Sequence, residues 1–467
     1  MDEPIPTTRQ KALALNLDGR TYGTFAEIGG GQEVARAFFA AGGAAGTLAK
    51  SISAYDMAVS DSLYGAAKRY VSRERLEAML ALEFSQLVNQ LGELRGERKC
   101  FFAFANTVAT RRFGSDENGR GWLGVRFQAH PRAEPSEVLI HAHLLDRESA
   151  HEQEAVGALG VNLIHGAFFM HEAPERLLAS LLDELSHERV EIDMVKFSGP
   201  AFTGVDNRLM SLQLVAQGLT DAAMFTALGD VVQPSEVLYK KAILAERGSF
   251  RPATKLTLDL LQRAMDLFAS DPAVRERGTP VVLAEMTLRS LTAGAGAGHD
   301  DFLARADILR ALGFDVLISR FELYYQLAEY LARYTDGPIG LAMGLPAVRL
   351  LLDENFYRNL AGGFLEAAGR LFKRSVKIYV YPGRDPVTGS VQTWDSMQLP
   401  SPWQHVHKLL MEFGHIVPIR SFDESYLAIH TPEVFALIEN DDPSWEQMVP
   451  PKVAEIIKAN RLFRRRA

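Results

Sequence analysis

Short apolar runs alternate with amphipathic helical segments through the second half of the chain, from about residue 238 onward. Strand-like runs at residues 281–286, 339–343 and 376–381 are separated by helical patterns such as the one at residues 254–268. Strands that alternate with helices of about 10–15 residues form βαβ units, and their strands lie parallel in one sheet. We therefore expect a doubly wound α/β domain at residues 236–467.

The first half of the chain is less regular, and we expect it to form a separate α+β domain over residues 1–235. The turn dipeptide Asp18-Gly19 predicts a hairpin between strands at residues 14–17 and 24–28. Further strands are expected at residues 101–105, 122–128, 138–145, 161–164 and 192–197, the second and third of these being antiparallel. Helices are expected at residues 32–41, 73–94, 175–185 and 207–217.

Composition excludes several classes of protein. The chain has 467 residues, 47% of them apolar, and a formal net charge of -8. This composition is that of an ordinary globular protein, and the acidic balance argues against nucleic-acid binding. The single cysteine, Cys100, excludes an internal disulfide, and no apolar run reaches the length of a membrane span. We expect a cytoplasmic protein without a signal peptide, whose oligomeric state stays open.

The most informative segment is the turn at residues 248–254, where an apolar strand runs through Gly248 into a helix. Such a turn directs backbone N–H groups and the positive end of the helix toward one point, which suits a phosphate group. Ser249 and Thr254 add hydroxyl groups, and Arg247, Arg251 and Lys255 add positive charge. The alternative is an ordinary βα connection with solvated basic side chains.

The same segment resembles the first βα turn of the nicotinamide/nicotinate mononucleotide adenylyltransferases. Their turn reads Gly-Ser/Thr-Phe-Asn/Asp-Pro and is followed by histidines and a leucine-rich helix. Here residues 248–254 read Gly-Ser-Phe-Arg-Pro-Ala-Thr, and residues 258–261 read Leu-Asp-Leu-Leu. A second similarity covers residues 428–434 and 448–463, which match that family's closing pattern in part. The resemblance covers about half of the chain, roughly residues 236–467.

The resemblance implies a nucleotidyltransferase-like domain that joins ATP to a pyridine mononucleotide with Mg²⁺, as in NAD biosynthesis. It implies that Lys255 and Arg251 supply catalytic charge. The residues that it implies for nucleotide binding are Gly248, Ser249, Phe250, Thr254, Thr257 and Thr431. However, Thr257 stands where the family has its essential second histidine. Two interpretations therefore stay open: an active adenylyltransferase, or a catalytically silent module that binds a nucleotide, another phosphorylated small molecule or a protein.

His141 and His143 alternate along one expected strand, so both side chains face the same side. Two imidazoles on one face can bind zinc when a third ligand comes from elsewhere, and His165, His171 or Asp146 could supply it. Paired histidines on strands are also common without a metal. The sequence alone therefore assigns no metal site.

Overall fold

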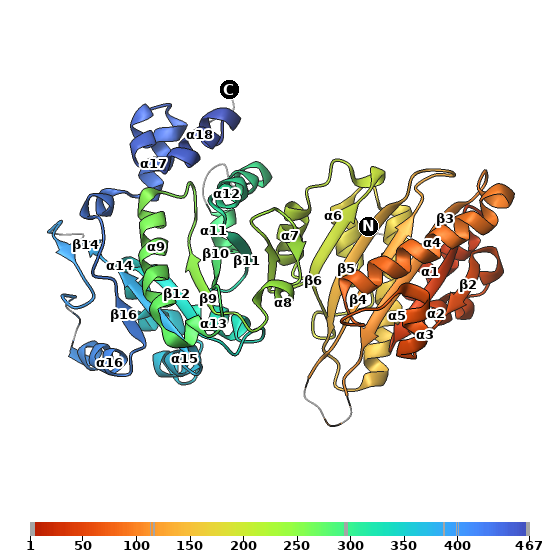
Figure 1. The fold of residues 1–467 in the computed structure, drawn as a ribbon, viewed down its shortest axis with the longest axis horizontal. Helices are drawn as coiled ribbons and strands as arrows, with labels where there is room; N and C mark the ends of the chain where they lie inside the picture. The colour runs from red at the N-terminus through yellow and green to blue at the C-terminus, as the bar shows by residue number, and fades with distance from the viewer. Residues whose placement is uncertain are drawn as a thin grey trace. The chain divides into compact units, whose positions relative to one another are not determined.

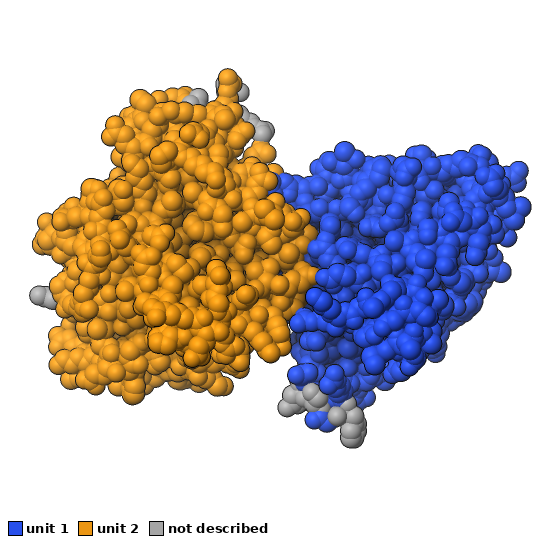
Figure 2. All heavy atoms as spheres, in the orientation of Figure 1, with its two compact units in different colours: residues 1–223 blue, residues 224–467 orange. Residues whose placement is uncertain are grey.

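The computed structural model describes residues 5–112, 114, 117–293, 298–385, 388–397, 399 and 401–463. The chain divides into two compact units, Met1–Ala223 and Met224–Ala467 (Figure 2). This division lies earlier than the boundary at residue 235 expected from the sequence. The reason is that three short elements join the second unit: β7 (Ala222–Phe225), β8 (Val231–Val232) and α8 (Pro234–Leu238).

Within the described residues, the first unit contains one six-stranded sheet with the order β2-β1-β3-β4-β5-β6 (Figure 1). Its strands are β1 (Thr21–Gly29), β2 (Leu48–Ile52), β3 (Cys100–Ala109), β4 (Gly119–Phe127), β5 (Ser136–Leu144) and β6 (Val190–Ser198). Strand β1 is parallel to β2 and β3, whereas β3 to β6 are antiparallel to one another. The expected antiparallel pairing of β4 and β5 is confirmed.

The helices of the first unit lie on both faces of this sheet. They are α1 (Thr8–Leu17), α2 (Glu33–Ala41), α3 (Met57–Tyr64), α4 (Arg73–Arg95), α5 (Ser149–Phe169), α6 (Pro174–Ser180) and α7 (Asn207–Ala216). The main core lies between the sheet and helices α1, α2, α5, α6 and α7. Helix α4 packs on the other face, against β1, β3 and β4.

Two expectations for the first unit are wrong. Residues 14–17 belong to helix α1 and not to a hairpin strand. Thr7 caps this helix and forms a reciprocal capping box with Gln10, which outweighs the turn signal of Asp18-Gly19. Residues 161–164 lie inside helix α5, which is buried on nearly all sides. A short apolar run does not distinguish a strand from a buried helix.

The second unit contains an eight-stranded sheet among its described residues, in the order β16-β13-β12-β9-β10-β11-β7-β8. Its strands are β7 (Ala222–Phe225), β8 (Val231–Val232), β9 (Ile243–Arg247), β10 (Val281–Thr287), β11 (Asp315–Ser319), β12 (Ile339–Gly344), β13 (Val376–Tyr381) and β16 (Ile416–Pro418). The six strands from β16 to β11 are all parallel. The expected doubly wound parallel sheet is confirmed, and so is the α/β fold class.

The helices of the second unit connect these strands. They are α8 (Pro234–Leu238), α9 (Lys255–Ser270), α10 (Pro272–Arg275), α11 (Leu288–Thr292), α12 (His299–Leu312), α13 (Tyr324–Leu331), α14 (Leu345–Leu351), α15 (Gly363–Leu371), α16 (Ser401–Glu412), α17 (Thr431–Glu439) and α18 (Pro451–Asn460). Helix α9 packs its apolar face on β9, β12 and β13 (Figure 1). A small antiparallel pair, β14 (Gly383–Arg384) and β15 (Val391–Gln392), follows β13. In the described part of the chain, no helix is long and apolar enough to cross a bilayer.

Candidate functional site

The order of the parallel strands marks one edge of the second unit as a candidate site. Strand β9 is the first of the series, β10 and β11 follow on one side of it, and β12, β13 and β16 lie on the other. The direction of winding therefore reverses between β9 and β12, which pair directly. In open α/β sheets, ligands bind at this reversal, outside the carboxyl ends of the strands. Arg247 ends β9 there, and Gly344 ends β12.

The 248–254 turn leaves β9 at this edge. The backbone N–H of Gly248 donates to the carbonyl oxygen of Glu285 on β10, at 3.1 Å. Phe250 adopts a positive φ of 46°, and its buried ring folds back over Gly248. A Cβ at position 248 would stand 3.0 Å from that ring. The space that the glycine leaves is thus taken by Phe250 of the same turn.

Thr254 and Thr257 cap the N-terminus of helix α9. The hydroxyl of Thr254 accepts from the backbone N–H of Thr257 at 3.3 Å, and the hydroxyl of Thr257 accepts from the backbone N–H of Thr254 at 3.4 Å. Thr254 is also almost fully buried, at 1% exposure. These two threonines therefore serve helix capping, and Thr257 does so at the position where the resembled family has its second histidine.

The two arginines of the turn are both held by carboxylates. Arg247 makes a bidentate ion pair with Glu285, at 2.8 and 2.9 Å, and lies over the ring of Tyr324. Arg251 pairs with Asp301 at 2.6 Å and lies over Phe435 of helix α17, 3.9 Å from its centroid.

Lys255 differs from both arginines. Its side chain is half-buried and makes no ion pair with a described residue. Its backbone N–H donates to the carbonyl oxygen of Met448 at 2.9 Å. The hydrogen bond between Lys255 and Met448 joins the two segments that carried the sequence resemblance. Arg251 contacts Phe435, one residue beyond the 428–434 part of the second segment. Thr431 lies at the start of α17, and no described contact joins its side chain to the turn.

Two glutamates at adjacent strand ends differ in their surroundings. Glu285 on β10 is fully buried and is bound by Arg247 and by the hydroxyl of Ser319, at 2.6 Å. Glu246 on β9 is buried too, but its Oε2 has no hydrogen-bond partner. Burial raises the pKa of Glu246 well above its usual range, which favours the neutral form of this carboxyl group. The negative charge at these strand ends is therefore that of Glu285, and Arg247 compensates it.

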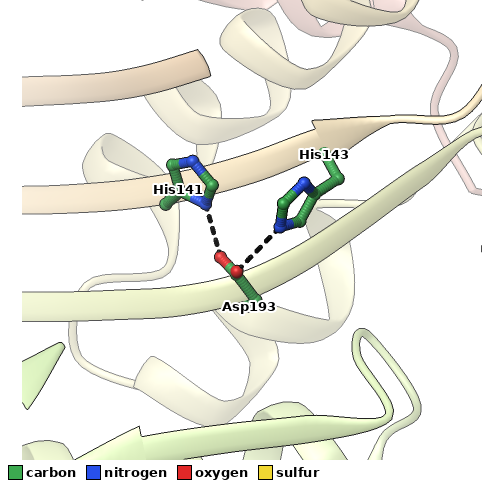
Figure 3. Close-up of side chains that lie close together, drawn as sticks. All are labelled: His141, His143 and Asp193. Carbon is green, nitrogen blue, oxygen red and sulfur yellow. Dashed lines mark hydrogen bonds and ion pairs between the residues drawn. The ribbon is translucent and has the colours of Figure 1, made fainter. Parts of the chain in front are cut away.

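A second group of polar side chains lies in the first unit, where Asp193 of β6 joins His141 and His143 of β5 (Figure 3). The Nδ1 atom of His141 lies 2.6 Å from one carboxylate oxygen, and the Nε2 atom of His143 lies 2.9 Å from the other. Burial lowers the pKa of His141, although Asp193 opposes this shift. Burial also raises the pKa of Asp193, but the two imidazoles lower it by more, so the carboxylate is ionised.

The third member of this group was missed by sequence reasoning. The structure does not bring His165, His171 or Asp146 to the two histidines; His165 packs on Phe169, and Asp146 pairs with Arg189. Asp193 lies 50 residues from His143 in the sequence, and no local pattern joins them. The one available signal was that Asp193 is an acidic residue inside an apolar strand.

Comparisons with known proteins assign no family to this chain. No family model and no curated protein sequence matches the chain. Among solved structures, it is similar to a competence-damaged protein (CinA) superfamily protein from Enterobacter cloacae, with 14% identity over 36% of this chain and 95% of the other, at a TM-score of 0.26. The competence/damage inducible protein CihA from Agrobacterium tumefaciens matches 35% of this chain and 97% of its own, with 14% identity and a TM-score of 0.25. Likenesses this low support no functional argument.

Proposed function

We propose that the second unit binds a nucleotide by its phosphates at the carboxyl edge of the sheet, between β9 and β12. The observation that carries this proposal is the strand order, because it puts the 248–254 turn at the point where the winding reverses. The ligand is ATP with Mg²⁺, or another phosphorylated small molecule of the same charge. Lys255 is the contact that we assign to the phosphates, since its cationic group makes no ion pair with a described carboxylate.

Binding without chemistry is the form of this proposal that the geometry favours. Adenylyl transfer chiefly requires cationic side chains and a metal ion placed against the negatively charged triphosphate. At this turn, Arg247 is paired with Glu285, and Arg251 shares Asp301 with the buried Arg305. Thr254 and Thr257 cap a helix.

Adenylyl transfer to a pyridine mononucleotide is the second candidate. It is favoured by the contact between Lys255 and Met448, which joins the two segments that resemble the adenylyltransferases. If the protein is an adenylyltransferase, Arg251 leaves its ion pair with Asp301 and binds the triphosphate instead. Lys255 and Arg251 then supply the positive charge for catalysis.

Isothermal calorimetry on the full chain tests binding, with ATP, ADP and adenosine in the presence and absence of Mg²⁺. We expect ATP to bind and Lys255→Ala to weaken its binding about 5- to 100-fold, which corresponds to one charge-assisted contact. Adenosine binding should not change. Lys452→Ala is the matched control, because Lys452 is exposed on α18 of the same unit. Absence of binding of both ATP and ADP to the wild-type protein would refute nucleotide binding at this turn.

Gly248→Val tests the turn itself. The added side chain must displace the Phe250 ring, so we expect ATP binding to fall strongly while helix α9 and the sheet remain folded. Gly369→Ala, where a Cβ meets nothing within 4 Å, controls for the addition of a side chain in this unit.

Formation of NAD or its deamido form from ATP, Mg²⁺ and either mononucleotide distinguishes the enzyme from the silent module.

A further inference from the structure

A β-bulge directs Asp193 toward the two histidines. On β5, the residues that face the main core alternate without interruption: Val138, Ile140, Ala142 and Leu144. On β6, the core-facing residues are Val190, Ile192, Val195 and Phe197, so the alternation skips one residue after Ile192. The register shifts at the same place, because His141 pairs with Met194 and Ala142 with Ile192, which leaves Asp193 as the extra residue.

This bulge has a consequence for the chemistry of the sheet. Bulges re-aim side chains, and they occur often beside functional sites. Here the bulge keeps Asp193 on the face of His141 and His143, away from the main core. The fully buried carboxylate is thereby held in direct contact with two imidazoles from the neighbouring strand (Figure 3).

We propose that His141, His143 and Asp193 form a binding site for a divalent transition-metal ion, with Zn²⁺ as the preferred ion. Two imidazole nitrogens and one carboxylate oxygen, each from a different side chain, lie within 4.8 Å of one another. Zinc binds such ligands at about 2.0–2.2 Å, so neighbouring ligand atoms in a tetrahedral site are about 3.3 Å apart. The observed separations of 2.6 and 2.9 Å must open to about this value to admit the ion.

The surroundings suit a metal site with an open position. The ring of His141 is fixed by Trp122, whose centroid lies 4.9 Å away, and it is nearly fully buried. The side chain of His143 is 23% exposed, so the site can be reached from solvent. Three protein ligands leave the fourth position of a tetrahedral zinc ion to water or to a ligand, as in catalytic zinc sites. The competing arrangement is a metal-free cluster in which both imidazoles donate to Asp193.

Metal titration of the full chain distinguishes these two arrangements. The protein is freed of metal with a chelator, and Zn²⁺ is then added in competition with a chromogenic chelator. We expect one tight site per chain. Co²⁺ in the same site should give the intense visible absorption of tetrahedral coordination, which surface histidines in octahedral complexes do not give.

Two substitutions in the cluster locate the ion. Asp193→Asn keeps the shape of the side chain but removes its charge, and His143→Ala removes a partly exposed ligand. Each should weaken Zn²⁺ binding by at least about 100-fold, because loss of a direct ligand exceeds the 10- to 100-fold effect of its supporting contacts. His130→Ala and His187→Ala, at exposed histidines, should bind like the wild type.

Three results would overturn the proposal: no stoichiometric Zn²⁺ binding by the wild type, an octahedral cobalt spectrum alone, or unchanged affinity in a folded Asp193→Asn protein. Circular dichroism establishes folding. If neither cluster variant folds, the wild-type stoichiometry and cobalt spectrum still decide the question. The outcome is independent of nucleotide binding in the second unit.

Discussion

At the scale of single residues, two buried acids of the second unit differ in whether a cation compensates them. Glu285 and Glu246 show the contrast at adjacent strand ends, since Arg247 and Ser319 bind the first and Oε2 of the second has no partner. Burying a charge is costly unless it is paired, and an unpaired carboxyl group takes up a proton instead.

This contrast predicts that the same Glu→Gln substitution destabilises the protein strongly at position 285 and only weakly at position 246. Glu285→Gln leaves the buried guanidinium of Arg247 without its counter-charge, and should lower the free energy of unfolding by about 3–5 kcal/mol. Glu246→Gln replaces a neutral acid by a neutral amide, and should change it by less than about 1 kcal/mol at neutral pH. Urea unfolding of both variants measures the difference. Equal destabilisation would show that Glu246 is ionised after all.

Glu27 of β1 predicts a pH dependence for the first unit. Burial raises the pKa of Glu27 to about 7, although the backbone N–H groups of Ala35 and Val34 and the amide of Asn106 partly oppose the shift. The folded protein therefore holds this proton more tightly than the unfolded chain. The stabilisation is complete below about pH 4.5 and is lost as the pH rises through about 7.

Glu27→Gln removes this titration. The unfolding free energy of the wild type, relative to this variant, should fall by on the order of 3 kcal/mol between pH 4.5 and 8. Urea unfolding at several pH values provides the measurement. Parallel stability curves for the two proteins would contradict a raised pKa.

At the scale of elements, glycines allow the close packing of two helices in the first unit. Helix α5 approaches α2 through Gly157 and Gly160, where added Cβ atoms would lie 2.9 Å from Glu33 Cβ and 2.4 Å from a Val34 methyl group. The two glycines thus allow α5 to pack closely on α2. Because α5 is buried on most sides, its apolar residues do not follow the one-sided pattern of a surface helix.

Gly160→Ala should destabilise the protein by about 1–3 kcal/mol, because the interior cannot admit another methyl group without moving Val34. Gly92→Ala in α4 is the matched control, since its Cβ would meet only a Val88 methyl group at 3.6 Å. It should stabilise by about 0.5–1 kcal/mol through helix propensity. Thermal unfolding of the two variants gives the comparison, and stabilisation by both would show that α2 and α5 separate easily.

At the scale of the whole molecule, the boundary between the units is set by strand β7. Its residues Met224 and Phe225 are buried, and Phe225 packs edge-on against Phe302 of α12. The strand lies between β11 and β8, so the second sheet is complete only when the chain begins before residue 222.

A pair of fragments tests this boundary. Residues 221–467 should unfold cooperatively as a monomer, because they keep β7. Residues 226–467 should have a lower melting temperature or aggregate, since β11 becomes an unpaired edge strand. Size-exclusion chromatography and calorimetry distinguish the two fragments. Equal stability would show that β7 contributes little to the second sheet.

Local pattern alone was sufficient for much of the second unit. The strand at β9, the helix that starts after Thr254 and the later alternation follow from the spacing of apolar residues, and that spacing depends only on near neighbours. The spacing of apolar residues wrongly predicted a strand at residues 161–164, which lie in helix α5. This helix is apolar on most sides because the fold buries it on most sides.

What the tertiary structure decided is the partner of each polar group. Arg247 and Lys255 look alike in the sequence, yet strand order puts Glu285, 38 residues away, beside the arginine. The meeting of His141, His143 and Asp193 depends on a bulge that shifts one strand by a single residue. Periodicity is a property of adjacent residues, whereas contacts between charges and ligands depend on distances that exist only after the strands have paired.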